Sequence, residues 1–116
     1  MMDKARFDVS AMLQRLDDDE ELVEDLLSMF LDLRESLVLP IEAAVKQRNA
    51  SSLYETAHRI KGSLNEIHAL DAVRLASRSE TAAREENIEE AVALSVQLID
   101  ETNAVADDVT RWLQRR

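Results

Sequence analysis

Apolar residues recur every three or four positions along nearly the whole chain, which is the spacing of amphipathic helices. A short first helix is predicted over residues 9–16 and a second from near Asp18 to about Arg48. The acidic run DDEE that starts at Asp18 suits a helix N-terminus, because carboxylates cap the free backbone N–H groups there. Pro40 interrupts the pattern and predicts a kink. The apolar stripe of this second helix is Leu22, Leu26, Phe30, Leu33 and Leu37.

The middle of the chain predicts two shorter helices. The third starts at Ser52, with Glu55 three residues later as its capping-box partner. After a turn at residues 68–70, a fourth helix is predicted over residues 71–85, where Ser79 and Glu80 break the apolar stripe. The inward-facing seam of the third helix is Leu53, Ala57, Ile60, Leu64 and Ile67, and the inward candidates of the fourth are Val73, Ala76 and Ala83.

The last helix follows the cap at Asn87, and helices joined by such short turns can bury their apolar faces only against one another. We therefore expect an all-α protein, an antiparallel four-helix bundle with a short additional N-terminal helix, in which residues 1–116 form one domain. The single Gly, the single Pro and the 3% of aromatic residues agree with a helical protein. The predicted inward face of the last helix is Ile88, Ala91, Ser95, Leu98, Thr102, Val105, Val109 and Trp112.

The charge of the chain excludes some function classes. The formal net charge is −10, which disfavours both a nucleic-acid partner and an anionic membrane surface. The chain has no cysteine and therefore no disulfide, thiol chemistry or cysteine zinc site. Its apolar runs are too short to span a membrane, and MMDKARFD lacks a signal-peptide core. We expect a soluble, cytoplasmic monomer with no nucleic-acid or membrane partner.

The candidate chemistry lies in the segment ETAHRIKGSLNEIHA, which holds both histidines and the only glycine. Each helical residue turns about 100°, so His58 is rotated off the inward seam toward the edge of the bundle. Lys61 and Gly62 lie about one turn on and Asn65 two turns on, forming one polar patch beside His58. Glycine in mid-helix costs up to about 1 kcal/mol relative to alanine, so Gly62 indicates close approach of something else to the backbone.

A second helix contributes to this patch. An antiparallel hairpin whose turn centres on residue 69 pairs residues equally far from the turn, which sets Glu80 opposite His58. A carboxylate there would accept a hydrogen bond from one ring N–H, fix the tautomer and leave the other nitrogen free as a nucleophile. Arg84, one turn further along, would join the patch and contact a phosphoryl group or a partner.

The run AHRIKGSLNEIHA resembles the signature of histidine-containing phosphotransfer (HPt) domains, in which Ala-His-x-(hydrophobic)-Lys-Gly-Ser opens the motif. The upstream residues 19–63 also look like the usual HPt approach to the histidine. The resemblance implies that His58 is phosphorylated, that Lys61 is the phosphate-side cation and that Gly62 gives clearance for an incoming receiver domain. Glu80 and Arg84 fall where the family often has Gln or Glu and a basic residue.

What the resemblance implies is a histidine phosphotransfer protein of a two-component phosphorelay, acting in signal transduction. His58 would pass a phosphoryl group between receiver aspartates, or take it from a kinase, and the partners would be a response-regulator receiver domain or a hybrid histidine kinase. The chain has no Gly-rich phosphate loop, so we expect no ATP site, no enzyme activity of its own and no cofactor. Mg²⁺ is expected on the partner receiver domain only, and no metal site on this chain.

The chain departs from the family pattern at several positions. His68 replaces the usual Gly, and we expect it to be a solvent-facing or capping residue; Leu64 and Asn65 replace small residues after the Ser. Ala72 and Ser79 stand where larger apolar residues are frequent. A non-catalytic helical adaptor, which binds a receiver or kinase domain without carrying phosphate, is the alternative from another class. A fragment of a larger kinase, such as a chemotaxis-type phosphotransfer domain, is a third possibility.

Overall fold

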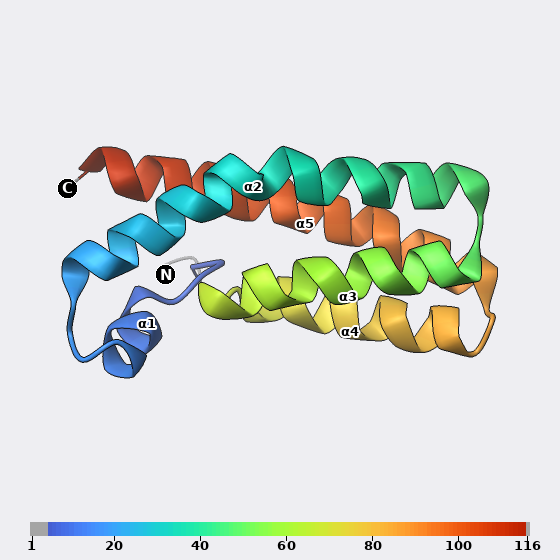
Figure 1. Ribbon diagram of the computed structural model, residues 1–116, viewed down its shortest axis with the longest axis horizontal. Helices are drawn as coiled ribbons and strands as arrows, with labels where there is room; N and C mark the ends of the chain where they lie inside the picture. The colour runs from blue at the N-terminus through green and yellow to red at the C-terminus, as the bar shows by residue number, and fades with distance from the viewer. Residues whose placement is uncertain (1–4, 116) are drawn as a thin grey trace.

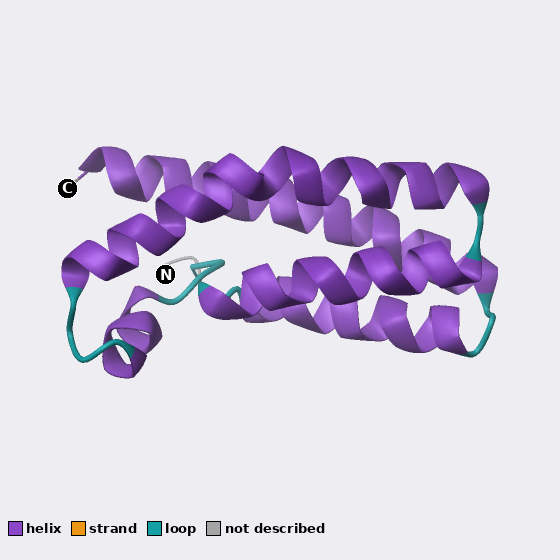
Figure 2. Cartoon of the chain, viewed as in Figure 1, coloured by secondary structure: helices purple, strands orange, loops and turns teal. Residues whose placement is uncertain are grey.

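The computed structural model describes residues 5–115, which fold into five α-helices without a strand. The helices follow one another with short connections and lie in a body of 42 × 28 × 25 Å (Figures 1 and 2). None of the helices in this part of the chain is long and apolar enough to cross a membrane. The helices are α1 (Val9–Arg15), α2 (Glu20–Gln47), α3 (Ala50–Glu66), α4 (Leu70–Arg84) and α5 (Ile88–Arg115).

Four of these helices form an antiparallel bundle, as the sequence predicted. Helices α2 and α5 are the long pair, and α3 and α4 form the shorter pair beside them (Figure 1). Each bundle helix packs most extensively against two neighbours, in the order α2, α3, α4, α5 and back to α2, and α3 also contacts α5. The short α1 crosses the end of the bundle at which α2 begins (Figure 1). The fold class and the extra N-terminal helix are therefore confirmed.

Side-chain caps set the starts of α1, α2 and α3. Asp19 caps α2 through a hydrogen bond from the Leu22 N–H, close to the predicted start. The predicted start of α3 at Ser52 is wrong, because Asn49 accepts the N–H of Ser52 at 3.0 Å and starts the helix at Ala50. Helix α2 also continues through Pro40, so proline does not end it. Tertiary packing on both sides of Pro40 outweighs the one missing backbone hydrogen bond.

The buried face of α2 differs from the predicted stripe. Leu22 and Leu33 are 38% and 45% exposed, so their assignment to the core is wrong. By helical geometry the buried face is rotated about 60° from the predicted one. The apolar arc of α2 is wide. The predicted stripe follows one edge of this arc, whereas α3 and α5 cover the opposite edge. The buried residues of α2 are Val23, Leu27, Phe30, Leu37, Val38, Ile41 and Ala44.

Helix α4 turns its small residues inward, which allows close packing on α3 and α5. Ser79 is fully buried, and its Oγ lies 2.9 Å from Oγ of Ser95 on α5. Ser79 is therefore part of the core and does not interrupt the buried face, because its hydroxyl is satisfied across the helix interface. The alanines that surround it in the buried face are Ala72, Ala76, Ala82 and Ala83.

The connection between α3 and α4 sets the register of the two helices that carry the candidate site. His68 has φ 53° and stands just past the end of α3. Its N–H donates to the carbonyl of Asn65, and the N–H of Ala69 donates to that of Leu64. These two bonds form a Schellman motif, whose left-handed position is usually glycine. Of the two roles expected for His68, solvent-facing or capping, the structure therefore shows the capping role, and Nε2 of His68 is buried.

Candidate functional site

His58 lies on α3 one position beyond the buried Ala57, on the side of the helix that faces out of the bundle. Its side chain is 63% exposed, whereas Ala57 and Ile60 are essentially buried. The periodicity of α3 predicted this arrangement, because a residue next to an inward seam points to the bundle edge. An exposed imidazole on a rigid helix can react with a group on another molecule.

Glu80 of α4 lies opposite His58, as the hairpin register predicted. Its Oε2 is 2.6 Å from Nδ1 of His58, and its side chain is only 7% exposed. An ionised carboxylate can only accept hydrogen bonds, so Nδ1 of His58 carries the proton. In the neutral ring the lone pair is then on Nε2, the nitrogen that Glu80 does not contact.

Lys61 completes the surroundings of the buried carboxylate. Its Nζ donates to Oε1 of Glu80, so each oxygen of the carboxylate has a partner from α3. Burial alone would raise the pKa of the Glu80 carboxyl, but the hydrogen bonds from Lys61 and His58 outweigh it and hold the pKa below its ordinary value. Lys61 therefore holds Glu80 ionised, and its ammonium group lies one turn from the imidazole.

Tyr54 is a site residue that the sequence reasoning missed. Its ring stacks on the imidazole of His58 with 5.8 Å between centroids and 8° between planes. Arg84 lies on the same tyrosine, with its guanidinium 5.2 Å from the ring centroid and 3.1 Å from the hydroxyl. Arg84 thus joins the patch as predicted, but through Tyr54. Two signals could have found Tyr54: it precedes His58 by one turn, and it lies opposite Arg84 in the same hairpin register.

Gly62 and Asn65 extend the patch along α3. A Cβ built on Gly62 would meet no atom within 4 Å, so no packing within the described chain requires a glycine there. Asn65 is exposed and lies two helical turns from His58, or about 10 Å along the axis. The side chain of Asn65 is therefore too far along the helix to touch the imidazole.

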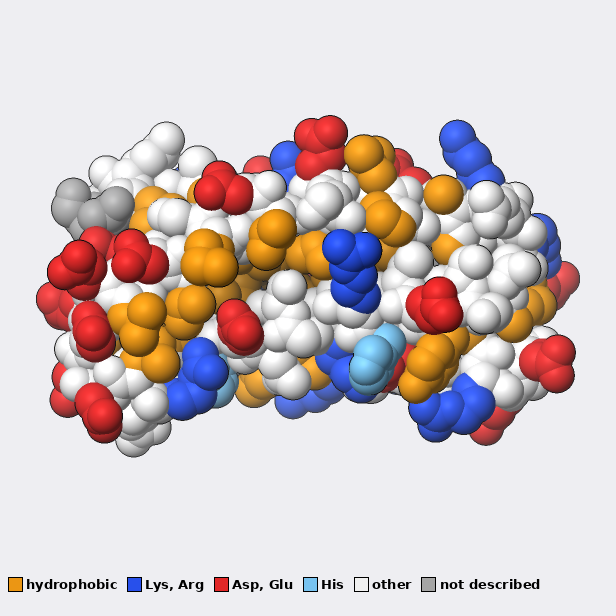
Figure 3. All heavy atoms as spheres, viewed as in Figure 1, with side chains coloured by type: hydrophobic (Ala, Val, Ile, Leu, Met, Phe, Trp, Pro, Cys, Tyr) orange, Lys and Arg blue, Asp and Glu red, His pale blue; other side chains and the backbone are white. Residues whose placement is uncertain are grey.

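The molecular surface shows how the charges are distributed (Figure 3). Acidic side chains gather at the end where α1 joins α2, whereas basic, hydrophobic and a few acidic side chains lie around the exposed histidine. On this face of the molecule the acidic side chains are therefore most numerous at the end that is far from the exposed histidine.

Among residues 5–115, no cluster of three or more His, Asp or Glu side chains has the geometry to hold a metal ion.

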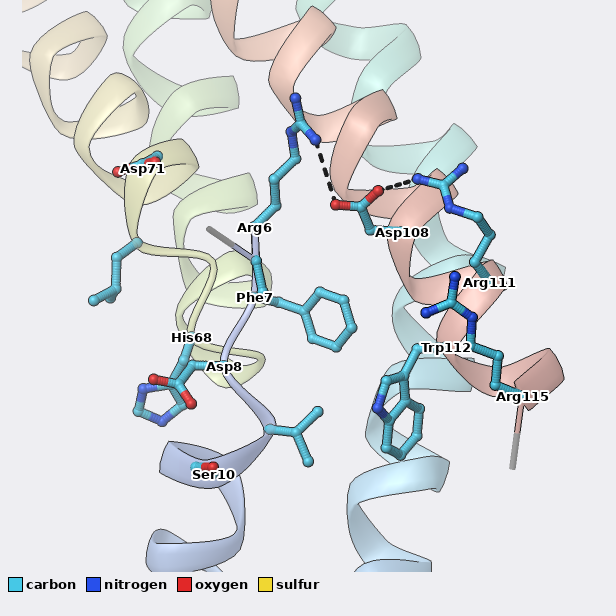
Figure 4. Close-up of a pocket in the computed structure, with 13 residues that line it drawn as sticks. Arg6, Phe7, Asp8, Ser10, His68, Asp71, Asp108, Arg111, Trp112 and Arg115 are labelled. Atoms are coloured by element: carbon cyan, nitrogen blue, oxygen red, sulfur yellow. Dashed lines mark hydrogen bonds and ion pairs between the residues drawn. The ribbon is translucent and has the colours of Figure 1, made fainter. Parts of the chain in front are cut away.

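A cavity of about 580 Å³ lies between the segment before α1, the α3–α4 turn and the end of α5. Phe7, His68 and Trp112 line it, together with Asp108, which bonds Arg6 and Arg111 (Figure 4). The cavity lining does not include His58 or its contact residues.

Two solved structures share the fold of nearly the whole chain. No protein of curated function matches it. Histidine-containing phosphotransfer protein B (HptB) from Pseudomonas aeruginosa PAO1 has the same fold, with a TM-score of 0.84, 24% identity and 98% and 99% of the two chains covered. The HPT domain of the Hpt sensor hybrid histidine kinase from Shewanella also has a TM-score of 0.84, at 21% identity over 96% of each chain.

A sequence model of the Hpt domain matches residues 25–111, which include α3, α4 and every residue of the patch around His58. The match thus spans three quarters of the chain and covers the segment that carries the candidate chemistry. The chain therefore belongs to the Hpt domain family and acts in histidine phosphotransfer in a phosphorelay.

Proposed function

We propose that His58 is the residue that carries the phosphoryl group, and that Nε2 is the atom that binds it. The observation that supports this is the hydrogen bond from Nδ1 to the buried carboxylate of Glu80 at 2.6 Å. That bond fixes the tautomer in which Nε2 has a lone pair and no proton. The exposed ring edge then presents a nucleophile toward solvent.

Transfer of the phosphoryl group to Nε2 requires no loss of a proton from that nitrogen, because the ring proton is on Nδ1. The Nε2 lone pair of His58 attacks the phosphorus of an aspartyl phosphate on a receiver domain. The N–P bond forms as the P–O bond to the aspartate breaks, and that electron pair returns to the aspartate as a carboxylate. The phosphorylated ring gains positive charge, which the carboxylate of Glu80 on Nδ1 stabilises. The reverse sequence passes the phosphoryl group to a second aspartate.

Lys61 and Gly62 have separate roles in this proposal. The ammonium group of Lys61 bonds Glu80 and lies close enough to swing toward a phosphoryl group on Nε2, where it would neutralise charge. Gly62 leaves the surface beside His58 low, because it has no side chain where the structure has open space. A receiver domain then has room to bring its aspartate to the imidazole.

The partners follow from the chemistry that this chain lacks. Phosphoryl transfer depends on positioning and on cations that neutralise the moving charge. We infer that a response-regulator receiver domain supplies the aspartate and its Mg²⁺, and that a hybrid histidine kinase supplies the phosphoryl group upstream. In this proposal the chain itself is a cytoplasmic, monomeric phosphocarrier without a cofactor. It has no ATP site of its own, because its single glycine allows no Gly-rich phosphate loop.

The experiment that tests the proposal is transfer of ³²P from phosphorylated receiver domains to the purified protein and to His58→Gln. We expect acid-labile, alkali-stable label on the wild-type protein and none on His58→Gln. His68→Gln is the matched control, because it removes the only other histidine, and it should label like the wild type. Label on His58→Gln would contradict the assignment. Binding of a receiver by both proteins, with label on neither, would support the adaptor alternative.

A further inference from the structure

The imidazole of His58 is held on its face as well as at its edge. Glu80 contacts the ring in its plane through Nδ1, and Tyr54 lies parallel to the ring at 5.8 Å. A single hydrogen bond to Nδ1 would still allow the ring plane to rock about that bond. The stacked tyrosine opposes this motion, so the two contacts together define the direction in which Nε2 points.

The position of Tyr54 follows from helix geometry. Side chains on an α-helix lean toward its N-terminus, so the imidazole of His58 leans over the residue one turn earlier, which is Tyr54. Tyr54 is itself held from the neighbouring helix, because Arg84 donates to its hydroxyl at 3.1 Å and covers its ring. Arg84, Tyr54 and His58 thus form one stack that connects the end of α4 to the reactive ring.

We propose that Tyr54 is a positioning residue for phosphoryl transfer at His58, and that Arg84 acts on the imidazole through Tyr54. This inference rests on the proposed function, because it concerns the orientation of the same nucleophile. It also differs from the role of Arg84 expected from sequence, a direct contact with a phosphoryl group or a partner. The guanidinium bonds the hydroxyl of Tyr54 and lies over its ring, so the contact of Arg84 on this surface is with the tyrosine.

The size of the effect can be estimated from the contact. A stacked aromatic pair favours one arrangement by roughly two- to tenfold over the unstacked ones. Loss of the flat tyrosine surface should therefore lower the maximal rate of transfer by about three- to tenfold. The receiver concentration that gives half of this rate should change less than about twofold, since the ring orientation affects the reaction step more than docking.

The test compares Tyr54→Leu with the conservative variant Tyr54→Phe. NMR of the unphosphorylated proteins should show an upfield shift of the His58 ring protons, caused by the stacked ring, in the wild type and in Tyr54→Phe. Tyr54→Leu should lose that shift while keeping the melting temperature within a few degrees. In transfer from a phosphorylated receiver domain at saturating receiver, Tyr54→Leu should be about three- to tenfold slower than the wild type, and Tyr54→Phe should stay within about twofold of the wild-type rate.

Two results would overturn the inference. One is a His58 ring signal that does not respond to Tyr54→Leu, which would mean that the rings are not stacked in solution. The other is a wild-type maximal transfer rate in Tyr54→Leu, or a loss that lies entirely in the receiver concentration required. The proposed function fails separately, through labelled His58→Gln, and the NMR comparison decides on the stack without any phosphorylation.

Discussion

Replacement of Gly62 by alanine should separate the stability of the bundle from its ability to transfer phosphate. The residue lies within α3, with open space where a Cβ would stand. Alanine is favoured over glycine in a helix interior by about 0.8–1.0 kcal/mol. Because, outside the adjoining turns of α3, no atom of the described residues lies within 4 Å of the new methyl group, no tertiary contact opposes this gain. We expect Gly62→Ala to raise the free energy of unfolding by nearly the full amount.

The corresponding thermal shift is measurable. An entropy of unfolding of about 2.1 cal/mol/K per residue means that 1 kcal/mol shifts the melting temperature of a chain of this size by about 4 °C. Circular dichroism at 222 nm should therefore show a melting temperature about 3–4 °C higher in Gly62→Ala. Ser28→Ala is the matched control, because Ser28 is exposed on α2, far along the sequence from the His58 patch. It should be modestly stabilising and leave transfer unchanged.

The transfer assay on the same proteins tests the clearance role. If the surface beside His58 must stay low for a receiver, Gly62→Ala should slow transfer at limiting receiver by about tenfold or more, since a single misplaced contact can cost that much. A more stable Gly62→Ala that transfers at the wild-type rate would refute the clearance role. A Gly62→Ala variant that is less stable than the wild type would show that the helix has no room for a Cβ at this position.

Two further predictions concern the groups that the α3–α4 hairpin places. His68→Gly should raise the free energy of unfolding by about 1 kcal/mol, because a left-handed Schellman position costs a side chain about that much and because Nε2 of His68 is buried without a partner among residues 5–115. Urea unfolding measures this change, and a loss of stability would mean that the packing of the imidazole outweighs the strain. Glu80→Gln should remove the part of the pH dependence of the free energy of unfolding that comes from this carboxyl group. The folded pKa of Glu80 lies below its ordinary value of 4.5, so its contribution to stability is present above that pH and is lost as the pH falls through the folded pKa. Urea unfolding from pH 7 to pH 3 should therefore show a gap between wild type and Glu80→Gln that narrows below about pH 4.5, and a constant gap would contradict this.

Much of the fold could be predicted because amphipathic periodicity is a local property of the sequence. It located the helices to within two residues and placed His58 at the bundle edge. It could not select the buried edge of α2, where Leu22 and Leu33 belong to a wide apolar arc and only the neighbouring helices decide which part is covered. Nor could it show that Asn49, and not Ser52, caps α3, since both residue types are good caps.

The candidate site was predictable to the extent that it depends on register. An antiparallel hairpin with a short turn fixes which residues lie opposite each other. This register was sufficient to predict the contact of Glu80 with His58 that the structure shows. The bond of Lys61 to Glu80 and the stack of Tyr54 depend on side-chain rotamers, which the spacing of residues does not specify. Arg84 was assigned to the correct patch, but its contact partner required the structure.

The burial of Glu80 connects the stability of the bundle to its chemistry. A carboxylate that is 7% exposed is costly in a helical core unless both of its oxygens are bonded. His58 and Lys61 provide those bonds from one turn of α3, and the bond that satisfies Glu80 is the one that leaves Nε2 of His58 free. A carboxylate that interrupts an apolar stripe opposite a histidine is therefore informative in a helical sequence. It would be a packing defect in an inert bundle, whereas in the proposed function it fixes the tautomer in which Nε2 of His58 is the nucleophile.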